Sequence, residues 1–124
     1  MIKKRSNTGG NGLGKKGERL AARHLQRQGY RIIERSYRCA IGEIDLIAKK
    51  GDYLVFVEVK TRSDEKFGKP FESVDERKQT KIRKIADLYY SNLRDKNITC
   101  RFDVLSIEVK RNIHSIDHIE NAFM

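Results

Sequence analysis

Two carboxylates and an amine interrupt the most hydrophobic stretch of the sequence, residues 42–62 (GEIDLIAKKGDYLVFVEVKTR). Asp45 falls inside the first apolar run of this stretch, and Glu58 and Lys60 fall inside the second. Strand residues alternate between the two faces of a sheet, so we expect Glu58 and Lys60 on one face, among apolar neighbours. Charged groups in such a place need either a partner or a function.

The turn between the two runs predicts how the acids face each other. Residues 50–53 (KGDY) fit a two-residue hairpin loop, with Gly51 at a position that needs a positive φ. If the ends of this loop pair, the register places Asp45 directly opposite Glu58, with Cβ atoms about 4.5–5.5 Å apart. Two ionised carboxylates repel at that distance, so we expect a cation between them.

A divalent metal ion would meet this need. Mg²⁺ prefers carboxylate and water oxygens and is usually held by one or two protein carboxylates together with a substrate phosphate. Such an ion activates water and stabilises a leaving oxygen, and Lys60 would orient the water or stabilise the transition state. Asp45, Glu58 and Lys60 therefore form a minimal set for phosphodiester hydrolysis. The alternative is a structural ion pair of Lys60 with Glu58 or Asp45 on a solvated face.

The first predicted helix, residues 14–28, adds a third acid and a basic stripe. It ends at Gly29, a common signal for a helix C-terminus. Glu18 lies on the small-residue face that should pack inward, either as a third contributor to the metal site or as an acid favoured by the helix dipole. A nucleic-acid-binding set is predicted beside it: Lys15, Lys16, Arg19, Arg23 and Arg27, with Arg62 after the second apolar run.

The charge of the chain is concentrated at one end. The sequence has 124 residues and a net charge of +10, and residues 1–38 hold 11 Lys and Arg against 2 Asp and Glu. This asymmetry favours a polyanionic partner, DNA above all, and the alternative is a basic tail that only aids solubility. No apolar run reaches about 18 residues, so no membrane span is expected. Without a secretory signal, and with Cys39 and Cys100 expected as reduced thiols, a cytoplasmic protein is predicted.

The pattern along the chain predicts an α/β fold with a central mixed β-sheet flanked by helices. We expect a flexible basic arm over residues 1–13 and a single domain over residues 14–124. Residues 73–76 (SVDE) fit a capping box at the start of a second helix. The other expected elements are strands at 30–38, 41–49 and 53–61, a polar loop at 62–72, a second helix to about 94, and strands at 101–109 and 115–120.

The strings GEIDLI (42–47), VFVEVKTR (55–62) and RFDV (101–104) resemble the YraN-like family of small bacterial proteins, within the PD-(D/E)xK nuclease superfamily. The resemblance runs from about residue 14 to residue 109. It implies a restriction-endonuclease-like αβββαβ core and an endonuclease that uses Mg²⁺ or Mn²⁺. Similarity to archaeal Holliday-junction resolvases implies branched or structured DNA, in repair or recombination. Matched by motif, the catalytic residues are Glu18, Asp45, Glu58 and Lys60, and the metal ligands are Asp45, Glu58 and Glu18.

The sequence departs from the superfamily pattern at two points. Ile44 stands where a proline precedes the first acid, and Gln79 is followed four positions later by Arg83, where the exonuclease branch has tyrosine. Gln79 is interpreted either as support for the metal site or as a surface residue. Asp103 either supports the site or pairs with Arg101.

The sequence also leaves a second class of function open. The chain is either the nuclease or a non-catalytic nucleic-acid-binding or assembly module that keeps the nuclease fold. The sequence does not fix the oligomeric state, and a homodimer is one candidate. His114 and His118 have a spacing that binds metal on a helix, but their segment predicts a strand and has no third ligand.

Overall fold

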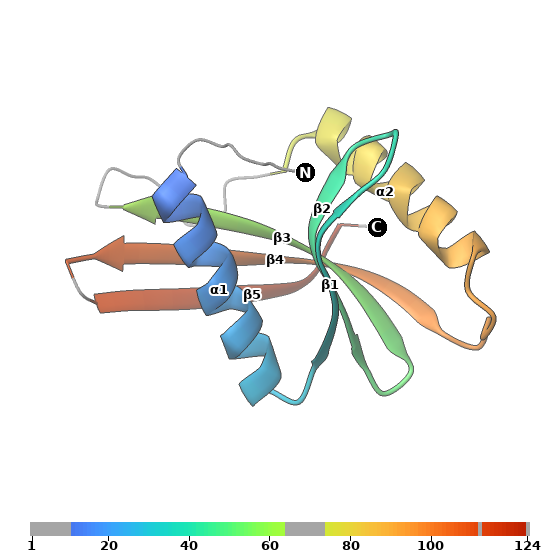
Figure 1. The fold of residues 1–124 in the computed structure, drawn as a ribbon, viewed down its shortest axis with the longest axis horizontal. Coiled ribbons are helices and arrows are strands. Elements are labelled where there is room, and N and C mark those ends of the chain that lie inside the picture. Colours follow the sequence, from blue (N-terminus) through green and yellow to red (C-terminus); the bar gives the residue numbers. More distant parts are fainter. Residues whose placement is uncertain (1–10, 64–73, 112, 124) are drawn as a thin grey trace.

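The structure, a computed structural model, describes residues 11–63, 74–111 and 113–123. Its elements follow the predicted order, a helix, three strands, a helix and two strands (Figure 1). Their bounds are α1 Asn11–Arg27, β1 Arg31–Arg38, β2 Glu43–Lys50, β3 Tyr53–Ser63, α2 Glu76–Ser91, β4 Thr99–Lys110 and β5 Ile113–Phe123.

The strands form one mixed sheet in the order β1-β2-β3-β4-β5. Only β3 and β4 run parallel, and the other neighbouring pairs are antiparallel. The two helices lie against opposite faces of the sheet (Figure 1). This confirms the predicted α/β class and is consistent with a restriction-endonuclease-like core. Neither helix in the described ranges is long and apolar enough to cross a membrane.

β3 is buried on both faces because its side chains are apolar on both sides. Val55 and Val57 pack in the cluster under α1, while Leu54 and Phe56 pack in the cluster under α2. The helices complete the two clusters with small and branched residues on their inner faces: Ala21, Ala22 and Leu25 from α1, and Ile82, Ile85 and Ala86 from α2. The central strand therefore fixes Glu58 rigidly between two packed layers.

Several predicted boundaries differ from the observed ones. Residues 11–13 belong to α1 and not to the predicted arm, whose residues 1–10 lie outside the described ranges. The predicted loop at 62–72 begins inside β3, and its residues 64–72 also lie outside those ranges. The cap of α2 is Asp75, whose carboxylate accepts a hydrogen bond from the Lys78 amide. The predicted capping box with Ser73 as the cap is therefore wrong, because Asp75, nearer the first helical turn, supplies the acceptor.

The sheet splits at the centre of the molecule. The β2–β3 ladder runs from Lys50↔Tyr53 to Leu46↔Val57, in the register that the turn predicts. Beyond this point β2 continues beside β1 as far as Arg38↔Glu43, while β3 continues beside β4 as far as Ser63↔Val109. The two strands of the hairpin thus separate where the predicted acids are found (Figure 1).

Candidate functional site

Asp45 is the first β2 residue beyond the paired part of the hairpin. Its Oδ2 atom accepts a hydrogen bond from the Val59 amide of β3 at 2.8 Å. The expected backbone pair of Asp45 with Glu58 is therefore not formed, since the last pair of the ladder is Leu46↔Val57. The physical reason is that the amide of Val59 in β3 donates its hydrogen bond to the side-chain carboxylate of Asp45 instead of to a main-chain carbonyl of β2.

The two acids interact electrostatically all the same. Burial, followed by the charge of Glu58, raises the pKa of Asp45 well above its usual range, and Glu18 adds to the effect. The Val59 amide and the Lys78 ammonium oppose it without cancelling it. The repulsion expected from the sequence is thus present, although the ladder differs from the expected one.

Glu58 has a partner that sequence reasoning missed. Its carboxylate is buried, and its Oε2 atom lies 2.5 Å from the Lys78 ammonium of α2. Lys60, also on β3 and two residues beyond Glu58, is only partly buried and pairs with Ser106 in the β4 ladder. The ammonium that binds Glu58 in the described structure therefore comes from α2 and not from Lys60. A cation in the first turn of a helix, where the dipole disfavours it, was the available signal for Lys78.

Glu18 reaches this region because α1 approaches β3 very closely. A Cβ atom on the preceding residue, Gly17, would overlap the side chain of Thr61, so only glycine fits at this contact. Glu18 is partly buried, and its Oε1 atom accepts a hydrogen bond from the Ser36 hydroxyl at 3.4 Å. Acids from α1, β2 and β3 thus share one electrostatic environment.

The donor atoms of this region suit a hard divalent cation. Within the described residues, no group of three or more His, Cys, Asp or Glu side chains is arranged to hold a metal ion. Two carboxylates, Asp45 and Glu58, remain as ligands, which is the number that Mg²⁺ commonly takes from a protein. The raised pKa of Asp45, caused by burial and by Glu58, reflects negative charge that a cation would neutralise. The residues present therefore fit Mg²⁺ or Mn²⁺ with two protein ligands.

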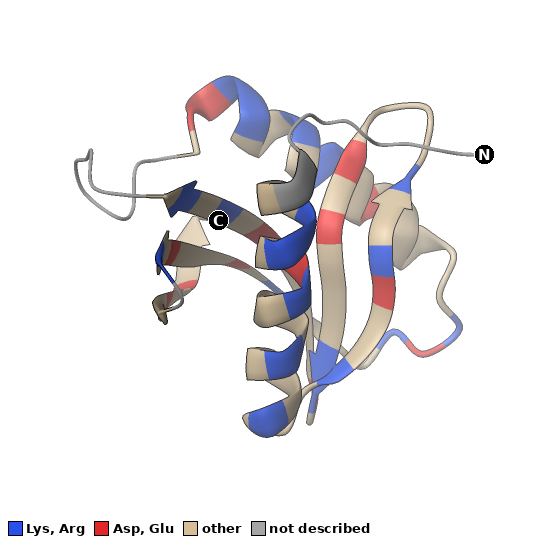
Figure 2. Cartoon of the chain, turned by 60° about the vertical axis from the view of Figure 1, so that its left-hand side comes forward, with Lys and Arg blue, Asp and Glu red and all other residues tan. Residues whose placement is uncertain are grey.

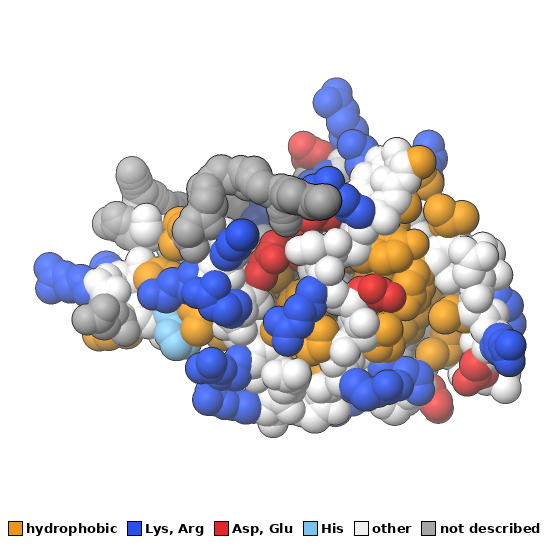
Figure 3. Space-filling view, in the orientation of Figure 1, with side chains coloured by type: hydrophobic (Ala, Val, Ile, Leu, Met, Phe, Trp, Pro, Cys, Tyr) orange, Lys and Arg blue, Asp and Glu red, His pale blue; other side chains and the backbone are white. Residues whose placement is uncertain are grey.

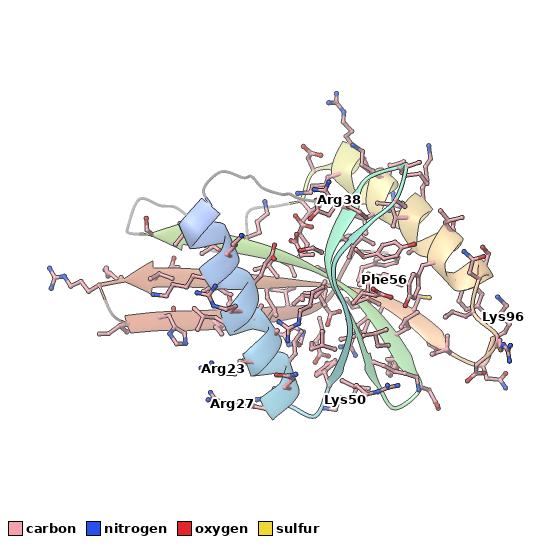
Figure 4. All side chains as sticks on the ribbon, viewed as in Figure 1. Arg23, Arg27, Arg38, Lys50, Phe56 and Lys96 are labelled. Atoms are coloured by element: carbon pink, nitrogen blue, oxygen red, sulfur yellow. The ribbon has the colours of Figure 1, made fainter. Side chains whose placement is uncertain are left out.

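A basic stripe runs along α1 beside these acids. Figure 2 shows Lys and Arg along the helix and acidic bands on the neighbouring strands, and the space-filling view shows the basic side chains gathered on this face (Figure 3). Arg23 and Arg27 point away from the sheet (Figure 4). Four stripe residues are exposed and one is partly buried: Lys15, Arg19, Arg23 and Arg27, and Lys16. Arg62, near the end of β3, is partly buried.

The two predicted supporting residues have other contacts. The Gln79 side chain donates a hydrogen bond to the Val74 carbonyl at 2.8 Å, which fixes the chain at the start of α2. Asp103 is fully buried and forms an ion pair with Arg101, as one of the two interpretations expected. His118 lies 2.7 Å from the same carboxylate, while His114 is exposed, and both are on β5, which is longer than the strand predicted at 115–120.

Comparison with known proteins gives the chain a family. A model described as uncharacterised protein family UPF0102 matches residues 17–107. A UPF0102 protein of Thermodesulfovibrio yellowstonii is 50% identical over 111 residues, which cover 90% of this chain and 95% of that protein. A UPF0102 protein of Caldanaerobacter subterraneus is 45% identical over 114 residues, covering 90% of this chain and 93% of that one. The family expected from the motifs is thereby confirmed, and the chain belongs to the uncharacterised protein family UPF0102, the YraN-like family.

Proposed function

We propose that this protein is a metal-dependent endonuclease that hydrolyses phosphodiester bonds in DNA, with branched or structured DNA of repair and recombination as its substrate. The observation that supports this most is the acid pair at the separation of β2 and β3. There, burial and the charge of Glu58 raise the pKa of Asp45 well above its usual range. Strongly perturbed acids of this kind cluster at functional sites.

In this proposal each residue of the site has one role. Asp45 and Glu58 hold Mg²⁺ or Mn²⁺, which when bound polarises the phosphodiester and activates water. Lys60 orients the attacking water from the same strand as Glu58, and Glu18 adds negative charge from α1. Because Asp45 is held by the Val59 amide and Glu58 by a strand packed on both faces, the two ligands are positioned before substrate arrives.

The basic stripe on α1 would bind the DNA. Its exposed guanidinium and ammonium groups would neutralise backbone phosphates, a contact that positions a nucleic acid without reading its sequence. Arg19 follows Glu18 on α1, and the charge of Glu18 acts on Asp45, so phosphates held along the stripe would lie near the acid pair. The same helix would therefore bind the substrate and contribute to the site.

A cleavage panel tests the proposal. Duplex, single-stranded, flap and four-way-junction DNA would be incubated with the wild type in Mg²⁺, Mn²⁺ or EDTA. We expect metal-dependent cleavage of a structured substrate, its loss in Asp45→Asn, and its retention in Asp52→Asn, which changes an exposed acid in the hairpin turn. Equal cleavage by Asp45→Asn and wild type would contradict the assignment of the site.

One observation favours the second candidate, a non-catalytic nucleic-acid-binding or assembly module. Both acids already have a protein partner, the Val59 amide for Asp45 and the Lys78 ammonium for Glu58. Under this alternative Mg²⁺ neither binds nor stabilises the protein, and Asp45→Asn leaves DNA affinity unchanged. Titration calorimetry with Mg²⁺ distinguishes the two functions without any substrate.

A further inference from the structure

Lys78 provides a cation to the acid site in the absence of metal. Its Nζ atom lies 2.5 Å from Glu58 Oε2, and the two side chains differ greatly in exposure, 48% for Lys78 and 8% for Glu58. The carboxylate is fixed on a buried strand, whereas the ammonium stands on a long flexible stem at the surface. Only the lysine can leave this pair without disturbing the core.

Lys78 faces more than one acid. Partial burial lowers the pKa of its ammonium, but the charges of Glu58, Asp45 and Asp75 outweigh burial and raise the pKa above its usual value. Its backbone is anchored, because its amide donates to the Asp75 carboxylate at 2.9 Å. The side chain therefore extends from a fixed point at the start of α2 toward the acid pair.

The helix gives no reason for a cation at this position. The first turn of a helix carries a partial positive charge, which disfavours Lys. The chain nevertheless places Arg77 and Lys78 in this turn, after Glu76, the acid that follows the cap. The contact with Glu58 is thus best understood from the acid pair, whose repulsion the ammonium reduces.

We propose that Lys78 is an exchangeable counter-ion of the Asp45–Glu58 pair, which binds Glu58 in the metal-free protein, is displaced when a divalent cation binds, and so sets the affinity of the site for metal. The inference rests on the proposed function for treating the acid pair as a metal site. It adds a residue from α2 and a form of regulation that the sequence motif does not contain.

Displacement follows from geometry and charge. A Mg²⁺ ion sits about 2.0–2.1 Å from its carboxylate ligands, so an ion on Glu58 Oε2 would stand close to an ammonium that contacts the same oxygen. Two like charges at such a distance repel strongly in a partly desolvated site. The lysine must therefore move into solvent, and the energy of breaking its ion pair is subtracted from the metal's binding energy.

The test compares Lys78→Met with the wild type, using Lys84→Met as the matched control on an exposed position of the same helix. Titration calorimetry at pH 8 with Mg²⁺ alone should give a Kd about tenfold lower for Lys78→Met, an order-of-magnitude value for removing one competing charge. Thermal melts in EDTA should show Lys78→Met melting lower by about 5 °C, because Glu58 loses its partner. Lys84→Met should match the wild type in both measurements.

A second variant and a measurement on the wild type keep the proposal testable even if Lys78→Met misfolds. In a Glu58→Gln background, Lys78→Met should lower the melting temperature in EDTA by less than it does in the wild type. In the wild type, the ammonium resonance of Lys78, assigned with Lys78→Arg, should shift when Mg²⁺ is added. An unshifted resonance, or a Lys78→Met variant with unchanged Mg²⁺ affinity, would overturn the exchange.

The outcomes separate this inference from the proposed function. If Mg²⁺ binds the wild type and Lys78→Met binds it no more tightly, the counter-ion role fails while the metal site stands. If Mg²⁺ binds Lys78→Met but is too weak to detect in the wild type, the exchange is supported. If neither protein binds Mg²⁺, both proposals are overturned. If Mg²⁺ binds and exchanges with Lys78 but no DNA is cut, the exchange is supported and the nuclease activity fails.

Discussion

Two carboxylate clusters are built on the sheet, and their electrostatics are opposite. Asp103, on the face covered by α1, accepts hydrogen bonds from Arg101 Nε and Nη2 at 3.0 and 2.8 Å and from the Asn121 amide at 3.0 Å. Burial raises the pKa of Asp103, but these bonds, together with that to His118, outweigh it and lower the pKa. Asp45, at the separation of β2 and β3, has a pKa raised by burial and by Glu58.

The difference teaches that burial alone does not distinguish a structural acid from a functional one. Asp103 is completely buried, yet enough donors surround it that its charge is stabilised. Arg101 extends the cluster by donating to the Tyr30 hydroxyl at 2.6 Å, which ties β4 to the segment after α1. Asp45 receives one amide hydrogen bond and part of the Lys78 charge, but it faces two other acids and its pKa stays raised, so a bound cation would add compensation.

The largest expected effect is on the Asp103 cluster. Asp103→Asn removes the charge that Arg101 and His118 surround, and breaking a buried ion pair should cost about 3 kcal/mol of unfolding free energy. Urea denaturation would measure it, with Glu108→Gln, an exposed acid on the same strand, as the control. A loss of unfolding free energy below about 1 kcal/mol would mean that the charge of Asp103 is not strongly stabilised by its partners, and the contrast with Asp45 would fail.

DNA binding tests whether the acid pair lies beside the substrate. Replacing Arg19, Arg23 and Arg27 with Ala should weaken DNA binding by one to two orders of magnitude and reduce the salt slope by about 2–3, because fewer counterions are released. The control removes three positive charges from exposed positions of α2: Arg77, Lys81 and Lys84. Fluorescence anisotropy at several salt concentrations measures both quantities. An equal loss in the two triple variants would point to general charge and not to the stripe.

Asp45→Asn tests the other half of the comparison. In EDTA the variant should be as stable as the wild type, or more stable by roughly 0.2–1 kcal/mol, because a cross-strand repulsion is relieved. Mg²⁺ at 100 times its Kd should stabilise the wild type by about 2.7 kcal/mol and leave the variant unchanged. Thermal or urea unfolding with and without Mg²⁺ measures both. A variant that is less stable in EDTA, beside a wild type that does not respond to Mg²⁺, would make Asp45 a structural acid like Asp103.

The smallest expected effect concerns His24, whose ring lies 6.3 Å from that of His118 at the edge of the Asp103 cluster. Burial, then the charges of His118 and Arg27, lower the pKa of His24. Between about pH 6.5, where an unfolded histidine titrates, and this lowered value, the unfolded chain binds more protons. Stability should therefore fall as the pH decreases through that window, by at most about 1.4 kcal/mol per pH unit.

His24→Gln isolates this contribution. The variant should lose less stability than the wild type between pH 7.5 and 5.5, as measured by urea denaturation. Asp103 stays ionised over this range because its pKa is lowered despite burial, by the bonds from His118, Arg101 and Asn121. If the stability of the two proteins depends on pH in the same way, His24 does not contribute to the pH dependence of stability.

The hairpin shows how far local sequence determines structure. Gly51 adopts φ +59°, as the turn requires, and the register follows the turn as far as Leu46↔Val57. Both features depend on neighbouring residues and alternating apolar positions, so the sequence predicts them. The end of the ladder was not predictable in the same way, because it depends on a side chain, that of Asp45, replacing a main-chain acceptor.

The partners of the two clusters show where sequence reasoning stops. Arg101 and Asp103 are two residues apart on one strand, so their ion pair could be expected from alternation. Lys78 and His118 come from distant segments, and only the packing of α2 and the pairing of β5 bring them to Glu58 and Asp103. Their side chains carry no local motif, and the unfavourable place of Lys78 in its helix was the one available hint.

The missing side chain at Gly17 has a consequence for how this protein can change over evolutionary time. The glycine lets α1 rest on Thr61, and α1 carries both the basic stripe and Glu18. Any larger residue at this position would push the helix away from β3. The basic stripe and Glu18 would then move together, so DNA binding and the position of this acid would change at the same time. Selection on either property therefore acts on the same position, whereas Gly14, with nothing within 4 Å of an added Cβ, is sterically free to vary.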